Sequence, residues 1–235
     1  MKIRFEIDKN YDAETFVFIL QSSNQESYSH TLKVDPRTIS KIRGGKLKDI
    51  NKFTKLVDET YDKCLPYIEK SREIYQESWD GIIDDFSGSV EKLTTPWFYK
   101  EYICVVTHFL SGVSNQDGNV IARNWMENPF TQRRITAHEI ILAHYFSIHK
   151  NNYPDSKLEQ KQVWALGEIA ALALTGLEPE LKKFWPWDTQ GYYTDHNYPE
   201  LVELQLMLKE PFLKRKSFDE YIKAGIEAIR KEKTL

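Results

Sequence analysis

Cysteine is scarce in this chain, and long apolar runs are missing from it. Two cysteines among 235 residues are too few for the disulfide framework of a small secreted domain. The longest apolar stretch, 103–110, contains Thr107 and His108 and falls well short of the roughly 20 residues that span a bilayer. We therefore expect Cys64 and Cys104 to be reduced, packed thiols, and we expect no membrane segment or membrane partner.

An excess of positive charge is also missing. The chain has 32 Lys and Arg residues against 35 Asp and Glu, a formal net charge of −3. A surface that holds a nucleic-acid backbone needs a basic excess, so we expect no nucleic-acid partner. The opening residues, MKIRFEIDKN, alternate charged and apolar side chains and lack the apolar centre of a secretory signal. These features favour a cytoplasmic protein.

The chain has the length and the hydrophobic content of one compact unit with a buried core. Alternation of Ile3, Phe5 and Ile7 with charged residues predicts a half-buried first strand. Residues 12–21 suit a helix or a strand equally well. Apolar spacings of three and four residues predict helices over 49–86, with Pro66 marking a break or a new start.

In the second half of the chain, apolar and charged residues alternate less, and apolar helices are more frequent. Two strands, 101–109 and 118–125, flank a turn-rich loop and predict a hairpin. Four helices are predicted after them, at about 131–149, 158–174, 199–209 and 218–231. The predicted fold class is α+β, with a mainly helical section over 1–97. A small sheet packed on helices is predicted over 98–235.

Two ionisable sites in apolar helices stand out in this pattern. His138 and Glu139 lie among isoleucine, leucine and alanine residues, and Glu168 lies alone in the apolar segment 164–171. Burying an ionisable side chain is unfavourable unless it is hydrogen-bonded, paired or bound to a ligand. We therefore expect these three residues to have partners in the folded protein.

The same residues resemble the small minimal-core gluzincin metallopeptidases, over roughly residues 98–200. That family carries the zinc motif HExxH on one helix and a third ligand, a glutamate, on the next, beside a sheet whose edge strand aligns the substrate. His138 and Glu139 match the start of the motif, and Glu168 matches the distal glutamate. The resemblance implies a zincin-like core, His138 and Glu168 as zinc ligands, and Glu139 as the general base of peptide hydrolysis.

The sequence departs from that motif at Leu142, because a leucine cannot bind zinc where the second histidine belongs. Histidines at i and i+4 lie about 40° apart around a helix and reach one metal ion. His144, two residues further on, points about 120° away from His138 unless the helix bulges. His149 shares the face of His138 but lies roughly 16 Å along the axis, too far to share a metal ion.

Three hypotheses about function follow. In the first, the zinc motif is degenerate, and the protein is an inactive relative of peptidases whose cleft binds a peptide or protein segment. In the second, His144 or another histidine, such as His108 or His196, completes an unusual zinc site and the chain is an active zinc peptidase. Tyr193 or His196 would then steady the oxyanion. In the third, the chain is an unrelated structural α+β protein.

Overall fold

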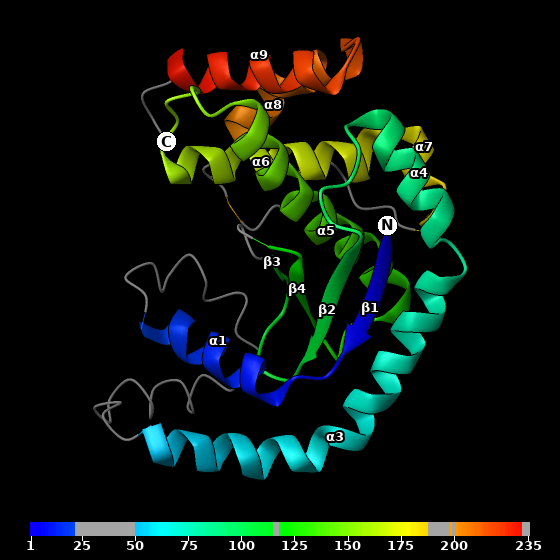
Figure 1. Ribbon diagram of the computed structural model, residues 1–235, viewed down its shortest axis with the longest axis vertical. Coiled ribbons are helices and arrows are strands. Elements are labelled where there is room, and N and C mark those ends of the chain that lie inside the picture. The colour runs from blue at the N-terminus through cyan, green and yellow to red at the C-terminus, as the bar shows by residue number, and fades with distance from the viewer. Residues whose placement is uncertain (22–49, 115–117, 188–197, 199–200, 232–235) are drawn as a thin grey trace.

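The computed structural model describes residues 1–21, 50–114, 118–187, 198 and 201–231. Within them, the fold is mixed α+β, with a small sheet of four strands in the order β1-β2-β4-β3 (Figure 1). The strands are β1 (Lys2–Glu6), β2 (Glu101–Thr107), β3 (Val113–Ser114) and β4 (Val120–Asn124). Strands β1, β2 and β4 run parallel, and β3 pairs with β4 in the antiparallel direction. Ile3 and Phe5 are buried while Lys2 and Arg4 are exposed, which confirms the predicted first strand.

The hairpin predicted between 101–109 and 118–125 is wrong. These segments form β2 and β4, which are neighbours but run parallel, with Ile103 opposite Val120. Parallel neighbours need a connection that returns the chain to the starting end of the sheet. The segment predicted as a loop contains β3, which runs back along β4 and pairs with it in the antiparallel direction.

Helices make up most of the remaining described chain. Residues 12–21, which suited a helix or a strand, belong to helix α1 (Lys9–Gln21). Helix α3 (Ile50–Asp80) contains Pro66 in its interior, so the prediction that Pro66 separates two helices is wrong. Proline removes one backbone hydrogen bond and can kink a helix without ending it, and α3 is visibly bent in Figure 1. Helix α4 (Ile83–Leu93) follows it.

The five later helices agree with the predicted positions, apart from one short addition. They are α5 (Pro129–Asn152), α6 (Gln160–Leu177), α7 (Pro179–Lys182), α8 (Val202–Lys214) and α9 (Phe218–Lys231). Helix α5 begins where the Asn128 side chain accepts a hydrogen bond from the backbone N–H of Phe130 at 2.9 Å, with Pro129 in the first turn. Strand β4 ends at Asn124, only four residues before Asn128. This short turn places α5 directly against the sheet.

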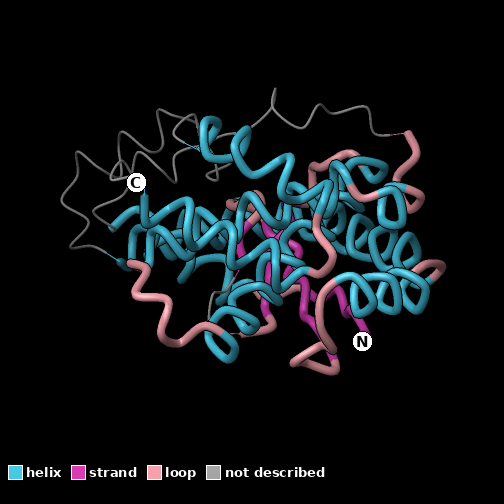
Figure 2. The backbone as a smooth tube through the Cα atoms, turned by 90° about the horizontal axis from the view of Figure 1, so that it is seen from above, coloured by secondary structure: helices cyan, strands magenta, loops and turns pink. Residues whose placement is uncertain are grey.

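The sheet is enclosed by helices, as the view from above shows (Figure 2). Helix α5 packs against β4, α3 and α6, and α6 in turn packs against α8 and α9. Both faces of β2 are buried from Cys104 onward, so α5 and α6 are core helices rather than surface helices. Both helices therefore lie in apolar surroundings, and any ionisable side chain on their inner faces needs a partner.

Both cysteines are free thiols in the folded chain. Cys104 is buried and Cys64 is half-buried; burial raises the pKa of the Cys104 thiol well above its usual value, which disfavours the reactive thiolate. None of the helices in the described ranges is both long enough and apolar enough to cross a membrane.

A buried carboxylate fastens α1 to the end of β2. Asp12 is fully buried, and its side chain accepts hydrogen bonds from the backbone N–H groups of His108 and Phe109. These two residues directly follow β2, where the strand's own pairing has ended. The carboxylate therefore satisfies two backbone donors that would otherwise be buried without a partner.

We predict that Asp12 makes the stability of the protein depend on pH. Burial raises the pKa of Asp12 to about 7, although the two N–H groups act in the opposite direction; an unfolded Asp has a pKa of about 3.9. The folded state then holds the proton more tightly, so the free energy of unfolding falls as the pH rises from about 4 to 7. Asp12→Asn should remove a slope of up to about 1.4 kcal/mol per pH unit. Urea unfolding across this range measures it, with the exposed Asp85→Asn as control, and an unchanged slope in Asp12→Asn would contradict the prediction.

Candidate functional site

The two helices α5 and α6 bring His138 and Glu168 together. His138 Nε2 lies 3.0 Å from Glu168 Oε2, and the two side chains are 14% and 11% exposed. Burial alone would lower the pKa of His138, but the hydrogen bond and the charge of Glu168 outweigh it and raise that pKa above its usual value. The imidazolium is therefore favoured, and His138 and Glu168 form a buried ion pair.

Leu142 occupies the place where the resembled motif has its second histidine. Its side chain is 3% exposed and lies against Gly167, the residue next to Glu168. A Cβ atom on Gly167 would come within 2.8 Å of Leu142 Cδ1 and 2.6 Å of the Tyr145 ring. Gly167 thus leaves room for the leucine, and apolar packing fills the space beside the His138–Glu168 pair.

Glu139 points away from that pair, toward the sheet. Its Oε1 atom lies 3.8 Å from Nη1 of Arg123, and Ser114 of β3 also hydrogen-bonds its side chain. Burial raises the pKa of Glu139, while the charges of His138 and Arg123 and the hydrogen bond from Ser114 act against the rise. Glu139 therefore connects the helix that carries His138 to the edge strand of the sheet.

Arg123 is the site residue that the sequence reasoning missed. It lies on β4 with its side chain only 2% exposed, and its Nε and Nη2 atoms donate to Oε2 of Glu127, with an Nε distance of 3.0 Å. Its Nη1 atom has no hydrogen-bond partner. A signal was available in the sequence, because an arginine between Ala122 and Asn124 ends an apolar strand run. We call His138, Glu139, Glu168, Arg123 and Glu127 the polar cluster.

The structure places the other candidate histidines elsewhere. His144 is fully buried, its Nε2 atom lies 3.3 Å from the carbonyl oxygen of Thr95, and its ring packs on Trp97 with centroids 4.4 Å apart. Burial lowers the pKa of His144 to about 4, so it is a neutral core histidine. The predicted turn of about 120° away from His138 accounts for this placement, since α5 continues as a helix through both residues.

His108 also has a partner of its own, because its Nδ1 atom accepts a hydrogen bond from the indole N–H of Trp125 at 3.0 Å. Tyr193 and His196, predicted as oxyanion donors, lie outside the described residues. The prediction that His196 binds a metal ion therefore also concerns a residue outside them. Of the six predicted site residues, the described chain therefore brings three into the polar cluster, namely His138, Glu139 and Glu168.

A catalytic zinc ion ordinarily takes three protein ligands and a water molecule. Across the described ranges, no three His, Cys, Asp or Glu side chains are arranged to hold a metal ion. His138 and Glu168 face each other, Leu142 fills the third position and Glu139 turns to Arg123. The described donor set therefore does not fit a catalytic zinc ion.

We predict that the polar cluster is sensitive to one added methyl group at Gly112. A Cβ atom at this residue would lie 2.4 Å from Oε1 of Glu139 and 2.5 Å from Nη1 of Arg123. Gly112→Ala should push the two charged groups apart and lower the free energy of unfolding by about 1–3 kcal/mol, a typical cost of overpacking. Denaturant unfolding measures the loss. Gly88→Ala, where a Cβ meets nothing within 4 Å, is the control, and equal effects at both glycines would contradict the prediction.

The polar cluster thus joins two core helices, a central strand and the edge strand through paired charges. Its acidic and basic groups are buried or half-buried, and they form an ion-pair network beside the four-stranded sheet. No family model, curated protein or solved structure matches this chain.

Proposed function

We propose that this protein binds an extended peptide or protein segment in a metallopeptidase-like cleft and does not hydrolyse it. The observation that carries the proposal is the contact of His138 Nε2 with Glu168 Oε2 at 3.0 Å, beside a buried Leu142. In the resembled family, both polar groups would face a metal ion. Here they satisfy each other, so the site is complete as an ion pair without a third ligand.

The arrangement of elements supports the resemblance to a peptidase core. The His138–Glu139 helix follows a strand of a mainly parallel sheet, and Glu168 lies on the next helix. A short antiparallel strand, β3, forms the sheet edge on the side of that helix, and Ser114 of β3 hydrogen-bonds Glu139. An edge strand beside the helix that carries the motif is what the resemblance predicts for substrate alignment.

The two edges of the sheet differ in a way that favours β3 as the binding edge. At the β1 edge, the backbone N–H of Phe5 donates to Oε1 of Gln76 at 2.8 Å, and Nε2 of Gln76 donates to the carbonyl of Ile3 at 3.2 Å. One side chain therefore occupies the backbone groups to which a peptide would pair. At the other end, β3 pairs with no strand but β4 within the described chain, and an unpaired edge is a template for strand addition.

The test combines metal content, binding and cleavage on one preparation of the full chain. Fluorescein-labelled casein, an unfolded protein, is the probe, and its anisotropy and fragmentation are followed with and without added zinc. We expect binding without cleavage and no zinc retained after dialysis. Ser114→Pro, which stiffens β3 and removes a backbone donor, should weaken binding at least about tenfold, whereas Arg4→Ala at the β1 edge should not.

The other outcomes each overturn part of the proposal. About one zinc ion per chain together with cleavage, both lost in His138→Ala, would establish an active peptidase with a ligand from another part of the chain. Binding that is equally strong in Ser114→Pro would move the peptide site away from β3. If labelled casein does not bind at micromolar concentrations of this protein, the proposed peptide-binding function is wrong.

A further inference from the structure

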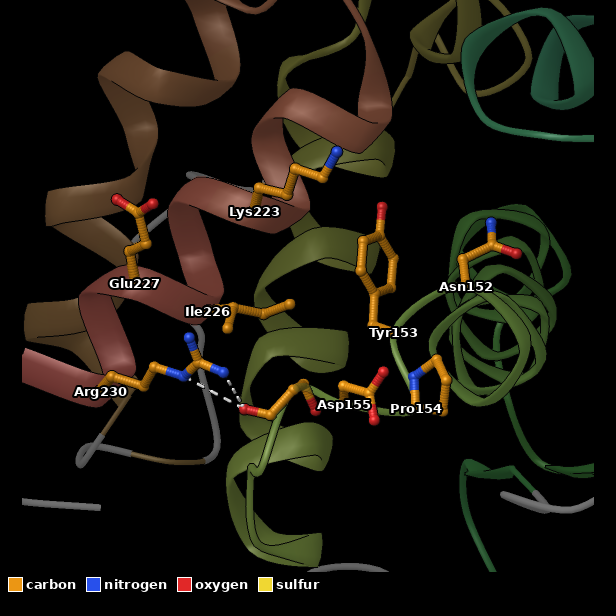
Figure 3. A pocket seen from close by; sticks show the side chains of 9 residues that line it. Asn152, Tyr153, Pro154, Asp155, Lys223, Ile226, Glu227 and Arg230 are labelled. Atoms are coloured by element: carbon orange, nitrogen blue, oxygen red, sulfur yellow. Dashed lines mark hydrogen bonds between the residues drawn. The ribbon is translucent and has the colours of Figure 1, made fainter.

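A second candidate site lies at the far end of α5, away from the polar cluster. A cavity of about 300 Å³ separates the connection between α5 and α6 from helix α9. In Figure 3, Ile226 and Arg230 of α9 reach toward the segment that contains Tyr153, Pro154 and Asp155, and Lys223 and Glu227 line the same cavity. The volume is at the lower end of the range for small-molecule sites, so a ligand of a few heavy atoms would fit.

Ser156 lines this cavity and is paired with a histidine. Its Oγ atom lies 3.2 Å from Nε2 of His149, and the two residues are 8% and 9% exposed. The backbone N–H of Leu158 donates to the same Oγ atom at 3.5 Å. In the tautomer that carries its proton on Nδ1, His149 Nε2 accepts the hydroxyl hydrogen of Ser156. Burial lowers the pKa of His149, which favours the neutral ring that a general base requires.

The backbone around Ser156 is unusual. Ser156 N–H closes a turn onto the carbonyl of Tyr153 at 3.0 Å, and Lys157, the next residue, has φ of 55°. Among the described residues it is the one non-glycine residue with positive φ. A side-chain-bearing residue seldom adopts this conformation, and such residues cluster at functional sites. The turn holds Ser156 between the end of α5 and the start of α6.

Charged side chains of both signs line this cavity, with Asp155 and Glu227 beside Lys223 and Arg230. Arg230 of α9 reaches across the cavity and donates from Nε and Nη2 to the carbonyl oxygen of Ser156, at 3.1 Å from Nε (Figure 3). Lys223 lines the same cavity and pairs with Asp219. A cationic group beside the nucleophile can stabilise negative charge that develops on a carbonyl oxygen.

We propose that Ser156 is a nucleophile, with His149 as its general base, that acts on short-chain carboxylic esters bound in this cavity. Ser156 Oγ forms a bond to the ester carbonyl carbon while its proton passes to His149 Nε2. The bond from that carbon to the alkoxy oxygen breaks, and the leaving alcohol takes the proton from His149. Water then attacks the acyl-serine with His149 as base, which releases the carboxylic acid and restores the hydroxyl. This activity is independent of peptide binding at β3.

The test is covalent labelling of the full chain with a fluorophosphonate, which captures an activated serine. Intact mass should show one adduct per folded chain, and peptide mapping should place it on Ser156, so the wild-type protein alone can decide. His149→Gln should slow labelling at least about 100-fold, and the wild-type rate should fall toward acid pH as His149 becomes protonated. The control is Ser147→Ala, because Ser147 lies on the same helix as His149 and donates to the carbonyl of Ala143. This variant should label normally, and the turnover of p-nitrophenyl acetate should follow the labelling in every variant.

Three results would overturn the proposal. The first is a folded wild-type chain that gains no adduct at millimolar reagent, which would leave Ser156 as a turn residue. The second is an adduct mapped to another residue. The third is labelling that is unchanged in a His149→Gln chain with an unaltered circular dichroism spectrum, because a merely structural pair would not set the labelling rate or its pH profile.

Discussion

Replacing Leu142 with histidine should create a protein that binds about one zinc ion. Residue 142 lies one helical turn after His138, so its imidazole would share a face with His138. Glu168 already lies 3.0 Å from His138, and Gly167 leaves the space that the new ring needs. Three protein ligands would then surround one position, as catalytic zinc requires. Elemental analysis after incubation with zinc and dialysis measures the gain.

The zinc site of Leu142→His has two matched controls. Leu142→Gln introduces a buried polar side chain of similar size without an imidazole and should retain no zinc. Adding Glu168→Ala to Leu142→His should abolish stoichiometric binding. Zinc at 100 times its dissociation constant should stabilise the histidine variant by about 2.7 kcal/mol. A folded Leu142→His protein that retains no zinc would mean that Glu168 cannot turn from His138 to a metal ion, and the likeness to a peptidase site would lose its geometric basis.

Removing Arg123 should be the most destabilising single change in the polar cluster. Arg123→Met would leave the carboxylates of Glu127 and Glu139 without their cation in a buried setting. Breaking a buried ion pair from one side costs about 3–5 kcal/mol, because the remaining charge keeps its desolvation cost. Chemical denaturation at pH 7 measures this loss, and the deficit should shrink at lower pH as Glu139, whose pKa burial raises, takes up a proton.

Arg4→Met is the matched control for Arg123→Met. Arg4 also lies on a strand and pairs with two carboxylates, Glu6 and Glu101, but its side chain is 47% exposed. Exposed pairs of this kind contribute between about 0 and 1 kcal/mol. If both arginine variants lost less than about 1 kcal/mol, the carboxylates of the polar cluster would have to reach water in the folded protein, and the network would not be a structural element of the site.

Helical periodicity and burial cost predicted the side-chain positions of His138, Glu168 and His144. His138 and Glu168 were expected to have partners because each lies in an apolar helix, and they are partners of each other. The direction of His144 followed from 100° per residue, and that side chain indeed contacts Thr95 and Trp97 on another face. These inferences succeeded because a helix has one repeat, so the positions of its side chains follow from residue spacing alone.

Pairing between distant segments could not be predicted in the same way. The parallel register of β2 with β4 depends on the path of the chain through β3, and two residues of strand leave almost no periodic signal. Arg123 escaped because an arginine in a strand is usually exposed. Its burial depends on Glu127, in the turn after β4, and on Glu139 of α5, which reaches it only in the folded chain. The metallopeptidase likeness itself stays a prediction.

The Gln76 side chain that closes the β1 edge also limits how copies of this protein could join. Continuous growth by strand pairing requires two free sheet edges on each copy, so that each copy pairs with one neighbour at each edge. With β1 occupied by Gln76, strand pairing between copies is left with β3 among the described strands. Joining β3 to β3 is a two-fold contact that uses up both edges at once. Self-association through the described strands would therefore end at a pair, and Gln76 helps to block fibre growth at the β1 edge.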